Sequence, residues 1–245
     1  MLSYEEGGNV SVDSFACIFN DSSGYKSTAS RDSSKNLAFT VKAPLATCVT
    51  CNEGGVLFGG RENDLQMFDL TSISSSSSSY SSSSSVASVV AEPVWKAKNV
   101  PHDFLNLRVP IWITDMRILK PEESSVSKAH VVCGTGHKHI RVYDTLASNQ
   151  PVLSLDIGGE YRVTSVCPKV SGESVYIGDV AGNVYEWDLR MQRKLFTLKG
   201  FAGSVRSMNL STEGKYLACV GLDRYLRVYD TTGNKMVDTF YLKNR

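Results

Sequence analysis

Two pairs of potential metal ligands stand out in the sequence. His137 and His139 lie two residues apart and close to Cys133, while Cys48 and Cys51 form a CxxC pair. Two histidines on one face of a strand could bind a metal, but no third ligand follows at a convincing spacing. Cysteines three residues apart on a strand face opposite sides, which argues against joint binding. We therefore expect no metal and no other cofactor.

The motifs of the common enzyme classes are missing from the sequence. The chain contains no phosphate-binding loop, nucleophile elbow or dinucleotide-binding motif. Acidic pairs such as Glu122–Glu123 lie in polar stretches where solvation explains them. A metal-dependent hydrolase that uses His137, His139 and Asp115 is a remote alternative. The sequence thus indicates a protein that is not an enzyme.

Positive charge is concentrated locally. The 26 Lys and Arg residues nearly balance the 25 Asp and Glu residues, which argues against a generic DNA-binding protein. The stretch 190–206, however, has five cations and no acid, and further cations occupy expected turns. Cations that share one face could neutralise RNA phosphates. Equally, each could be a solvated turn residue.

Composition places the chain among ordinary globular proteins. Of its 245 residues, 42% are apolar and 21% are charged. No apolar stretch approaches the roughly 18 residues that span a bilayer, and the first ten residues do not resemble a signal peptide. Several of the six cysteines lie in apolar runs. We expect them to be buried free thiols in the nucleus or cytosol.

Four segments share one pattern, an alternating run that ends in an aromatic residue followed by Asp. They are DLQMFDL (64–70), HIRVYDT (139–145), NVYEWDL (183–189) and YLRVYDT (225–231). The repeat pairs are Phe68–Asp69, Tyr143–Asp144, Trp187–Asp188 and Tyr229–Asp230. The aspartates are separated by 75, 44 and 42 residues. The last two gaps match the period of about 40–45 residues that is typical of a four-stranded propeller blade.

The sequence between these segments also repeats. An apolar run that ends near Gly precedes each segment, an alternating run precedes that, and a further strand follows the Asp. This predicts four strands per unit and almost no helix. A sheet with two apolar faces buries them by stacking against its neighbours. We therefore predict an all-β propeller with about four recognisable blades, in which Phe68, Tyr143, Trp187 and Tyr229 pack between blades.

The residues from 198 to 230 resemble a WD repeat. The dipeptide Trp187–Asp188 belongs to the same pattern. The resemblance is imperfect, because Phe201 stands where the repeat normally has His. Seven residues before the repeat aspartates, Asp223 is the one aspartate, and Glu62, His137 and Ala181 stand at the other three places. The hydrogen-bonded tetrad of standard repeats is thus incomplete, and we expect stability to depend mainly on packing.

A narrower resemblance, from about residue 45 to 242, is carried by five strings in order. They are GGRENDLQMFDL (59–70), WKAKNVPHDFLNLRVPIWITDMRIL (95–119), GTGHKHIRVYDT (134–145), KGFAGSVRS (199–207) and GLDRYLRVYD (221–230). They are similar to the nucleolar WD-repeat assembly factors of the large ribosomal subunit precursor. This resemblance implies a seven-bladed ring, so we expect that blades on the N-terminal side are missing. The basic C-terminal tail of those proteins is also absent from the sequence.

The resemblance also implies a function. It predicts a non-catalytic scaffold in the nucleolus that binds pre-ribosomal proteins and pre-rRNA, and that an AAA-type ATPase releases. It predicts no membrane and no DNA partner. The contact residues should be the polar members of the matched turns, namely Arg61, Lys98, Asn99, Arg108, His137, Lys138, Arg206 and Arg224. The alternative is a WD-repeat adaptor that binds peptides in another multiprotein complex.

Three segments fall outside the regular repeat. Residues 1–44 are expected to be partial or degenerate blade material, with strands near 15–19 and 36–43, before the blades of 45–245. The Ser-rich segment 71–92 should be a disordered loop. The segment 97–110 contains Pro101 and Pro110 as strand breakers. It is either an interaction surface or packing at the propeller rim.

Overall fold

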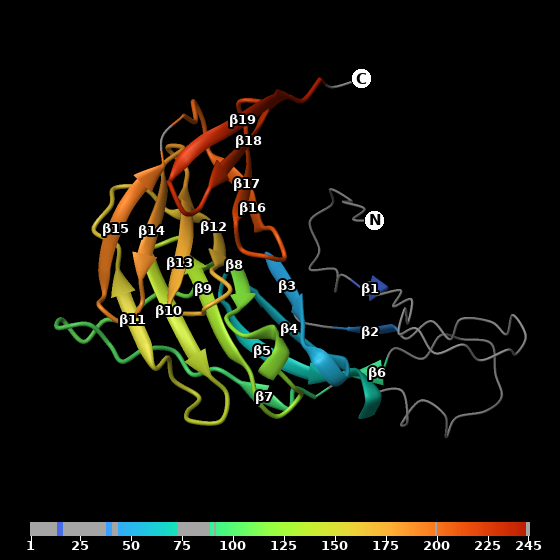
Figure 1. Ribbon diagram of the computed structural model, residues 1–245. Coiled ribbons are helices and arrows are strands. Elements are labelled where there is room, and N and C mark those ends of the chain that lie inside the picture. The colour runs from blue at the N-terminus through green and yellow to red at the C-terminus, as the bar shows by residue number, and fades with distance from the viewer. Residues whose placement is uncertain are drawn as a thin grey trace, which may run out of the picture. The chain divides into compact units, whose positions relative to one another are not determined.

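The chain folds into two compact units. The computed structural model describes residues 14–16, 38–40, 44–72, 89–90, 92–198 and 200–243 (Figure 1). One unit comprises residues 1–43 and 71–92, and the other comprises residues 44–70 and 93–245. Within the described segments, no helix has the length and apolar character needed to cross a membrane.

The larger unit contains four antiparallel sheets of four strands each, and the strands of each sheet lie side by side in chain order. The first sheet has β3 (Thr47–Thr50), β4 (Gly55–Gly60), β5 (Asn63–Asp69) and β7 (Trp95–Lys96). The second has β8 (Ile113–Ile118), β9 (His130–Thr135), β10 (His139–Asp144) and β11 (Leu153–Asp156). The third has β12 (Val163–Pro168), β13 (Ser174–Asp179), β14 (Val184–Asp188) and β15 (Arg193–Leu198). The fourth has β16 (Val205–Leu210), β17 (Tyr216–Gly221), β18 (Tyr225–Asp230) and β19 (Lys235–Tyr241).

The four sheets follow one another as propeller blades, here called blades 1 to 4. Their first strands are neighbours, because β3 packs beside β8, β8 beside β12 and β12 beside β16. Short 3-10 helices, η1 (Asn52–Gly54) and η2 (Pro121–Glu123), lie between the first and second strands of blades 1 and 2. The predicted all-β propeller with four recognisable blades is confirmed. The expectation of a seven-bladed ring stays a prediction.

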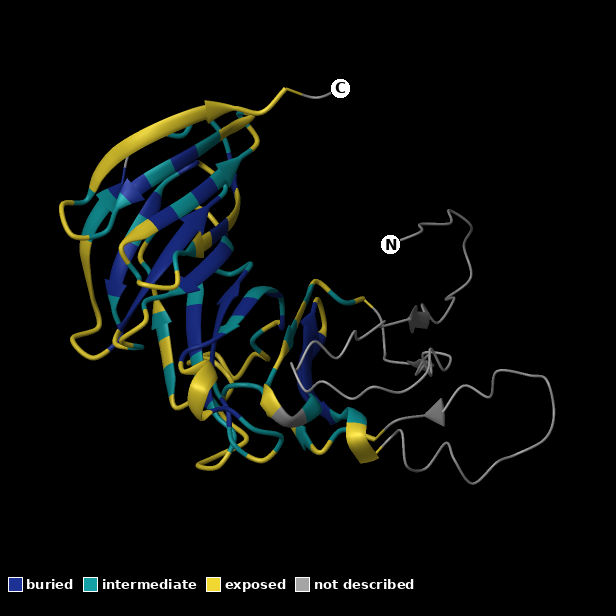
Figure 2. Cartoon of the chain, turned by 45° about the vertical axis from the view of Figure 1, so that its right-hand side comes forward, coloured by how far each residue is buried: buried dark blue, intermediate teal, exposed yellow. Residues whose placement is uncertain are grey.

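The core lies between the blades. Three hydrophobic clusters fill the interfaces of blades 1 and 2, 2 and 3, and 3 and 4. Tyr143, Trp187 and Tyr229 each belong to one of these clusters, as predicted. Phe68 is also buried, and its ring meets that of Phe58 edge-on at 5.8 Å within blade 1. Figure 2 shows buried residues along the inner strands of the blades, and β4 and β5 of blade 1 and β13 of blade 3 are buried almost throughout, whereas β19 is exposed along its whole length.

The four repeat aspartates occupy equivalent places, at the last residue of the third strand of each blade. Asp144, Asp188 and Asp230 each accept a hydrogen bond through Oδ1 from the backbone N–H two residues later, at 2.9–3.1 Å. A short acidic side chain that bonds to the backbone ahead of it starts a turn. The repeated Asp therefore marks where the chain reverses into the outer strand.

The repeated Gly has a different role, which is to let neighbouring blades approach closely. A Cβ atom at Gly134 on β9 would overlap the side chain of Val163 on β12. A Cβ at Gly178 on β13 would lie 2.7 Å from Cγ1 of Val205 on β16. Real Cβ atoms do not come this close to other heavy atoms, so glycine is needed at both contacts.

Asp115 on β8 joins the first strands of three blades. Its Oδ2 accepts hydrogen bonds from the backbone N–H of Val166 at 2.9 Å and from the Ser165 hydroxyl at 3.1 Å, both on β12. Its Oδ1 accepts from the N–H of Met116 at 2.9 Å and from the Thr47 hydroxyl on β3 at 3.4 Å. Both carboxylate oxygens are thus engaged in holding the inner strands together.

The smaller unit contains one three-stranded sheet. β1 (Ser14–Ala16) pairs antiparallel with β2 (Ala38–Thr40), which pairs in parallel with β6 (Val89–Val90). β1 and β2 lie close to the strands expected near 15–19 and 36–43. That these strands derive from a blade stays a prediction. The expected disordered loop at 71–92 falls mainly on residues 73–88 and 91, which lie outside the described residues.

Candidate functional site

The hairpins between the second and third strands present side chains at one end of the blades. Glu62, Lys138 and Arg224 lie at the tips of these hairpins in blades 1, 2 and 4, and have φ angles of 52°, 65° and 65°. Blade 3 has Gly182 in this left-handed conformation. Non-glycine residues adopt it at a cost of about 1 kcal/mol or more, and such strain is often kept at functional sites. The tips are therefore the first place to look for a site.

Trp112, just before β8, gathers side chains from three blades. The Arg61 guanidinium carbon lies 5.3 Å from the centre of its ring system, and that of Arg162 lies 5.4 Å away. The ring of His137 meets the indole edge-on at 5.8 Å. A Cβ at Gly136 would overlap the indole, so glycine leaves room for it. We call Arg61, Trp112, His137 and Arg162 the Trp112 cluster.

The charge of the Trp112 cluster is unbalanced. Within the described part of the chain, neither Arg61 nor Arg162 has a carboxylate at salt-bridge distance. Burial lowers the pKa of nearby His139, and this outweighs the opposing effect of Asp156, so this imidazole is neutral at neutral pH. Lys138 adds a further positive charge at the neighbouring hairpin tip. Two arginines beside an indole suit anionic or aromatic ligands.

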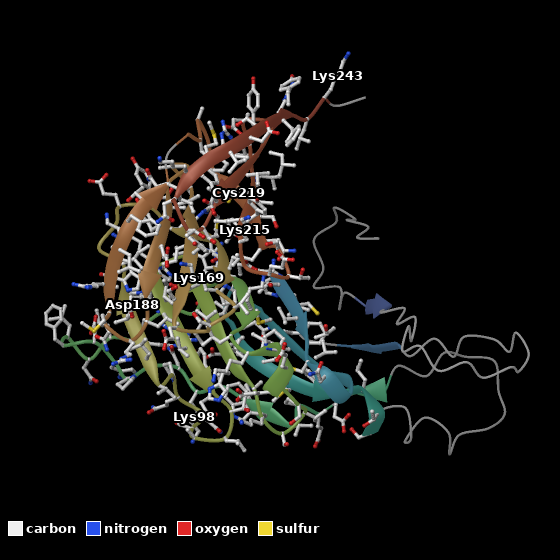
Figure 3. All side chains as sticks on the ribbon, viewed as in Figure 1. Lys98, Lys169, Asp188, Lys215, Cys219 and Lys243 are labelled. Carbon is white, nitrogen blue, oxygen red and sulfur yellow. The ribbon has the colours of Figure 1, made fainter. Side chains whose placement is uncertain are left out.

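The predicted contact residues of blades 1 and 2 have different surroundings. Arg61 and His137 meet at Trp112, and Arg108 reaches the blade 1 tip through a 3.0 Å ion pair with Glu62. Lys98 has an exposed side chain, and its backbone N–H donates to the Asn149 carbonyl at 2.7 Å. Figure 3 shows Lys98 close to the loop that joins β10 and β11.

Asn99 has a structural role at the base of the segment 97–110. Its side-chain amide donates to the Val109 carbonyl at 2.6 Å, and its Oδ1 accepts from the N–H of Val100 at 2.9 Å. Asn99 therefore closes the two ends of this segment against each other. Whether it also contacts a partner stays a prediction.

The predicted residues of blade 4 lie outside the Trp112 cluster. Arg206 is exposed on β16, and Arg224 is exposed at the hairpin tip between β17 and β18. The basic stretch 190–206 does not form one patch either. Arg190 precedes β15 and Arg206 follows it, so they are separated by the length of a six-residue strand, about 20 Å.

Cys133, Cys167 and Cys219 are buried, as was expected of the cysteines in apolar runs. Burial raises the pKa of the Cys133 and Cys219 thiols to about 12 and that of Cys167 to about 11. These three buried cysteine thiols are protonated and unreactive at neutral pH. Cys48 is exposed and Cys51 is intermediate. In the described segments no group of three metal-ligating side chains occurs.

Sequence reasoning missed two members of the Trp112 cluster. From the sequence, neither Trp112 nor Arg162 is singled out as a candidate residue. The available signal was a tryptophan at the start of an alternating run, followed by a Gly–His hairpin in the same repeat. This signal does not identify Arg61 or Arg162 as neighbours, because that depends on how blades 1 and 3 approach blade 2.

Comparisons with known proteins agree with the repeat assignment. The model of the family "WD domain, G-beta repeat" matches residues 192–230. "WD repeat-containing protein 74" of Bos taurus is 39% identical over 175 residues, which cover 71% of this chain and 39% of that protein.

"Ribosome biogenesis protein NSA1" of Eremothecium gossypii is 31% identical over 163 residues, covering 60% of this chain and 37% of that protein. The protein of the same name from Saccharomyces cerevisiae strain S288c is 28% identical over 213 residues, covering 77% and 42%. The chain thus spans about two fifths of the length of these curated relatives.

Proposed function

Since this chain is a WD-repeat homologue of the proteins just described, we propose that it is a non-catalytic scaffold in the assembly of the large ribosomal subunit. In this proposal it docks on the subunit precursor in the nucleolus and supports rRNA processing. Its partners are proteins of that particle and pre-rRNA, and an AAA-type ATPase releases it. The printed name of the NSA1 relatives, "Ribosome biogenesis protein", supports this role.

The observation that carries the proposal is the Trp112 cluster. Arg61, His137 and Arg162 come from three successive blades and meet around one indole. Guanidinium groups without carboxylate partners in the described chain can neutralise phosphates, and a half-buried aromatic ring beside them can contribute stacking to an unpaired base. A rigid platform that presents both groups together favours a single-stranded or looped RNA segment.

A scaffolding role also agrees with what the potentially catalytic side chains do. Both oxygens of Asp115 accept hydrogen bonds that join the inner strands of blades 1 to 3. His137 packs edge-on against Trp112. These two residues of the remote hydrolase alternative are therefore used for structure.

The proposal is tested with the full-length chain, tagged and expressed in place of the endogenous protein. We expect it to sediment with large-subunit precursors and to cross-link to pre-rRNA under ultraviolet light. The double variant Arg61→Ala/Arg162→Ala should weaken RNA cross-linking roughly tenfold and should reduce the salt dependence of binding by about one to two phosphate contacts.

The matched control is Arg190→Ala/Arg193→Ala, which removes the same charge from exposed positions outside the cluster. It should cross-link like the wild type. If the wild type sediments away from the precursors, and its depletion leaves rRNA processing intact, the proposal is wrong. Recovery with another multiprotein complex that lacks ribosomal assembly factors would then favour the adaptor alternative.

A further inference from the structure

The segment 97–110 exposes a group of large apolar side chains at its tip. Phe104 is 94% exposed, and Leu105 and Leu107 are 63% and 58% exposed. Their exposure contrasts with Ile111 and Ile113 a few residues later, which are buried in the cluster between blades 1 and 2. Contiguous exposed apolar groups on a folded protein commonly mark an interaction site.

The tip is held in one conformation by its own hydrogen bonds. Oδ1 of Asp103 accepts from the N–H of Leu105 at 3.0 Å and from that of Leu107 at 2.8 Å. The N–H of Asp103 donates to the Leu107 carbonyl at 3.0 Å, and the N–H of Asn106 donates to the Asp103 carbonyl at 2.9 Å. Asn106 has a φ of 60° and lies within hydrogen-bond distance of the His102 ring, with Oδ1 and Nδ1 separated by 3.0 Å.

The base of the segment is also fixed to the blades. Asn99 joins its two ends, and Arg108 forms an ion pair with Glu62 at the hairpin tip of blade 1. The N–H of Glu62 also donates to the Ile111 carbonyl at 2.8 Å. Because tip and base are both ordered before any partner arrives, little conformational entropy is lost when Phe104 is buried by one.

We propose that Phe104 and Leu105 are a preformed apolar anchor that inserts into an apolar pocket of a protein in the large-subunit precursor. The inference rests on the proposed function for the identity of the particle. Burial of an aromatic side chain in a fitted pocket is the usual source of a dominant contact in a protein interface. The anchor is a docking site separate from the Trp112 cluster.

The chemistry of the tip favours protein over RNA. Residues 101–107 include no Lys or Arg, and one carboxylate oxygen of Asp103 is already occupied by two backbone donors. RNA contacts depend on cations near the phosphates, which the tip does not offer. Two leucines beside the phenyl ring cannot stack on bases, but they can fill a pocket lined with aliphatic groups.

The first test compares binding of full-length variants to large-subunit precursors. Phe104→Ala should raise the dissociation constant for the precursors, obtained from the bound fraction, roughly 10- to 100-fold. Because the contact is apolar, the loss should be similar at low and high salt, unlike that of the Arg61→Ala/Arg162→Ala variant. Asp103→Ala, which releases the turn but keeps the phenyl ring, should give a smaller loss.

The matched control is Met191→Ala, which truncates an apolar side chain that is 58% exposed on a turn of blade 3. It should bind like the wild type. Both side chains are exposed, so thermal unfolding of the two variants should match that of the wild type. If Phe104→Ala binds the precursors as tightly as Met191→Ala, the anchor does not exist.

The second test does not depend on sedimentation. A benzophenone amino acid placed at position 104, or at position 191 as control, is photo-activated in cells, and the cross-linked peptide is sequenced by mass spectrometry. A protein peptide with apolar residues should cross-link from position 104 alone, and truncating those residues should reproduce the Phe104→Ala loss. Cross-links to RNA, to a second copy of the chain, or to nothing would overturn the proposal.

The two tests separate this inference from the proposed function. A wild-type chain that sediments away from the precursors refutes the proposed function, and with it the assignment of the anchor to that particle. If the Phe104→Ala variant binds the precursors as tightly as the wild type, the anchor is refuted, but the proposed function stays in place.

Discussion

Replacing Asp115 by Ala should destabilise the propeller more than any single surface change. The substitution removes an acceptor of four hydrogen bonds, three of which link β8 to β3 and β12, while the fourth lies within β8. Three of these bonds are 2.9–3.1 Å long, and the bond from Thr47 is weak at 3.4 Å. A hydrogen bond to a charged group contributes about 1.5–3 kcal/mol when buried, and less where water can replace it.

Asp115 is partly accessible, so the three shorter bonds should contribute about 1 kcal/mol each. We expect Asp115→Ala to lower the free energy of unfolding by about 3 kcal/mol, and the melting temperature by roughly 6–12 °C for a domain of this size. Urea unfolding measures this change as a lower midpoint at an unchanged slope.

Glu122→Ala, an exposed change on η2, is the control and should alter stability by less than about 0.5 kcal/mol. A double-mutant cycle between Asp115→Ala and Ser165→Ala should give a coupling energy of at least about 0.5 kcal/mol. If Asp115→Ala behaves like Glu122→Ala, or if the cycle shows no coupling, Asp115 does not join the blades as described.

Three further predictions concern separate parts of the chain. Burial alone would raise the pKa of Asp223, but hydrogen bonds from Arg227 and two backbone N–H groups outweigh it and hold that pKa below its ordinary value. The resulting stability is present above the unfolded-state pKa of about 3.9 and is lost as the pH falls through the folded-state value. In the Asp223→Asn variant, the free energy of unfolding should therefore fall less steeply at acidic pH than in the wild type. An equally steep fall in both proteins would contradict this. In the native protein at pH 8, iodoacetamide should modify Cys48 but none of the three buried cysteine thiols until urea unfolds the chain, as peptide mass spectrometry would show. Gly136→Ala should displace Trp112 and weaken RNA cross-linking as much as Arg61→Ala/Arg162→Ala does, and unchanged tryptophan fluorescence would contradict this.

The architecture could be predicted because its causes are local. Alternation of apolar and polar residues predicted the strands, and the recurring aromatic–Asp pair set the blade period. Tyr143, Trp187 and Tyr229 were placed correctly between blades because an aromatic residue at a fixed position of a repeated strand faces the same kind of neighbour each time. A repeat turns one local pattern into a prediction about packing.

The site was less predictable because it depends on contacts between blades. Arg61 and Trp112 are about fifty residues apart, and they meet through an isolated bridge that no periodicity encodes. Phe104 has the residue type of a core position, yet a turn built on Asp103 turns it toward solvent. A charge run in the sequence does not by itself predict a surface patch, because β15 separates the two ends of the stretch 190–206.

The close approach at Gly134 and Gly178 has a mechanical consequence. Each glycine lies on the second strand of its blade, and a valine of the following blade packs directly against it. The absence of a side chain at the glycine therefore sets how closely the two blades approach. We therefore expect a pulling force on one blade to separate it from its neighbour before the next interface opens, because each interface depends on its own glycine–valine contact.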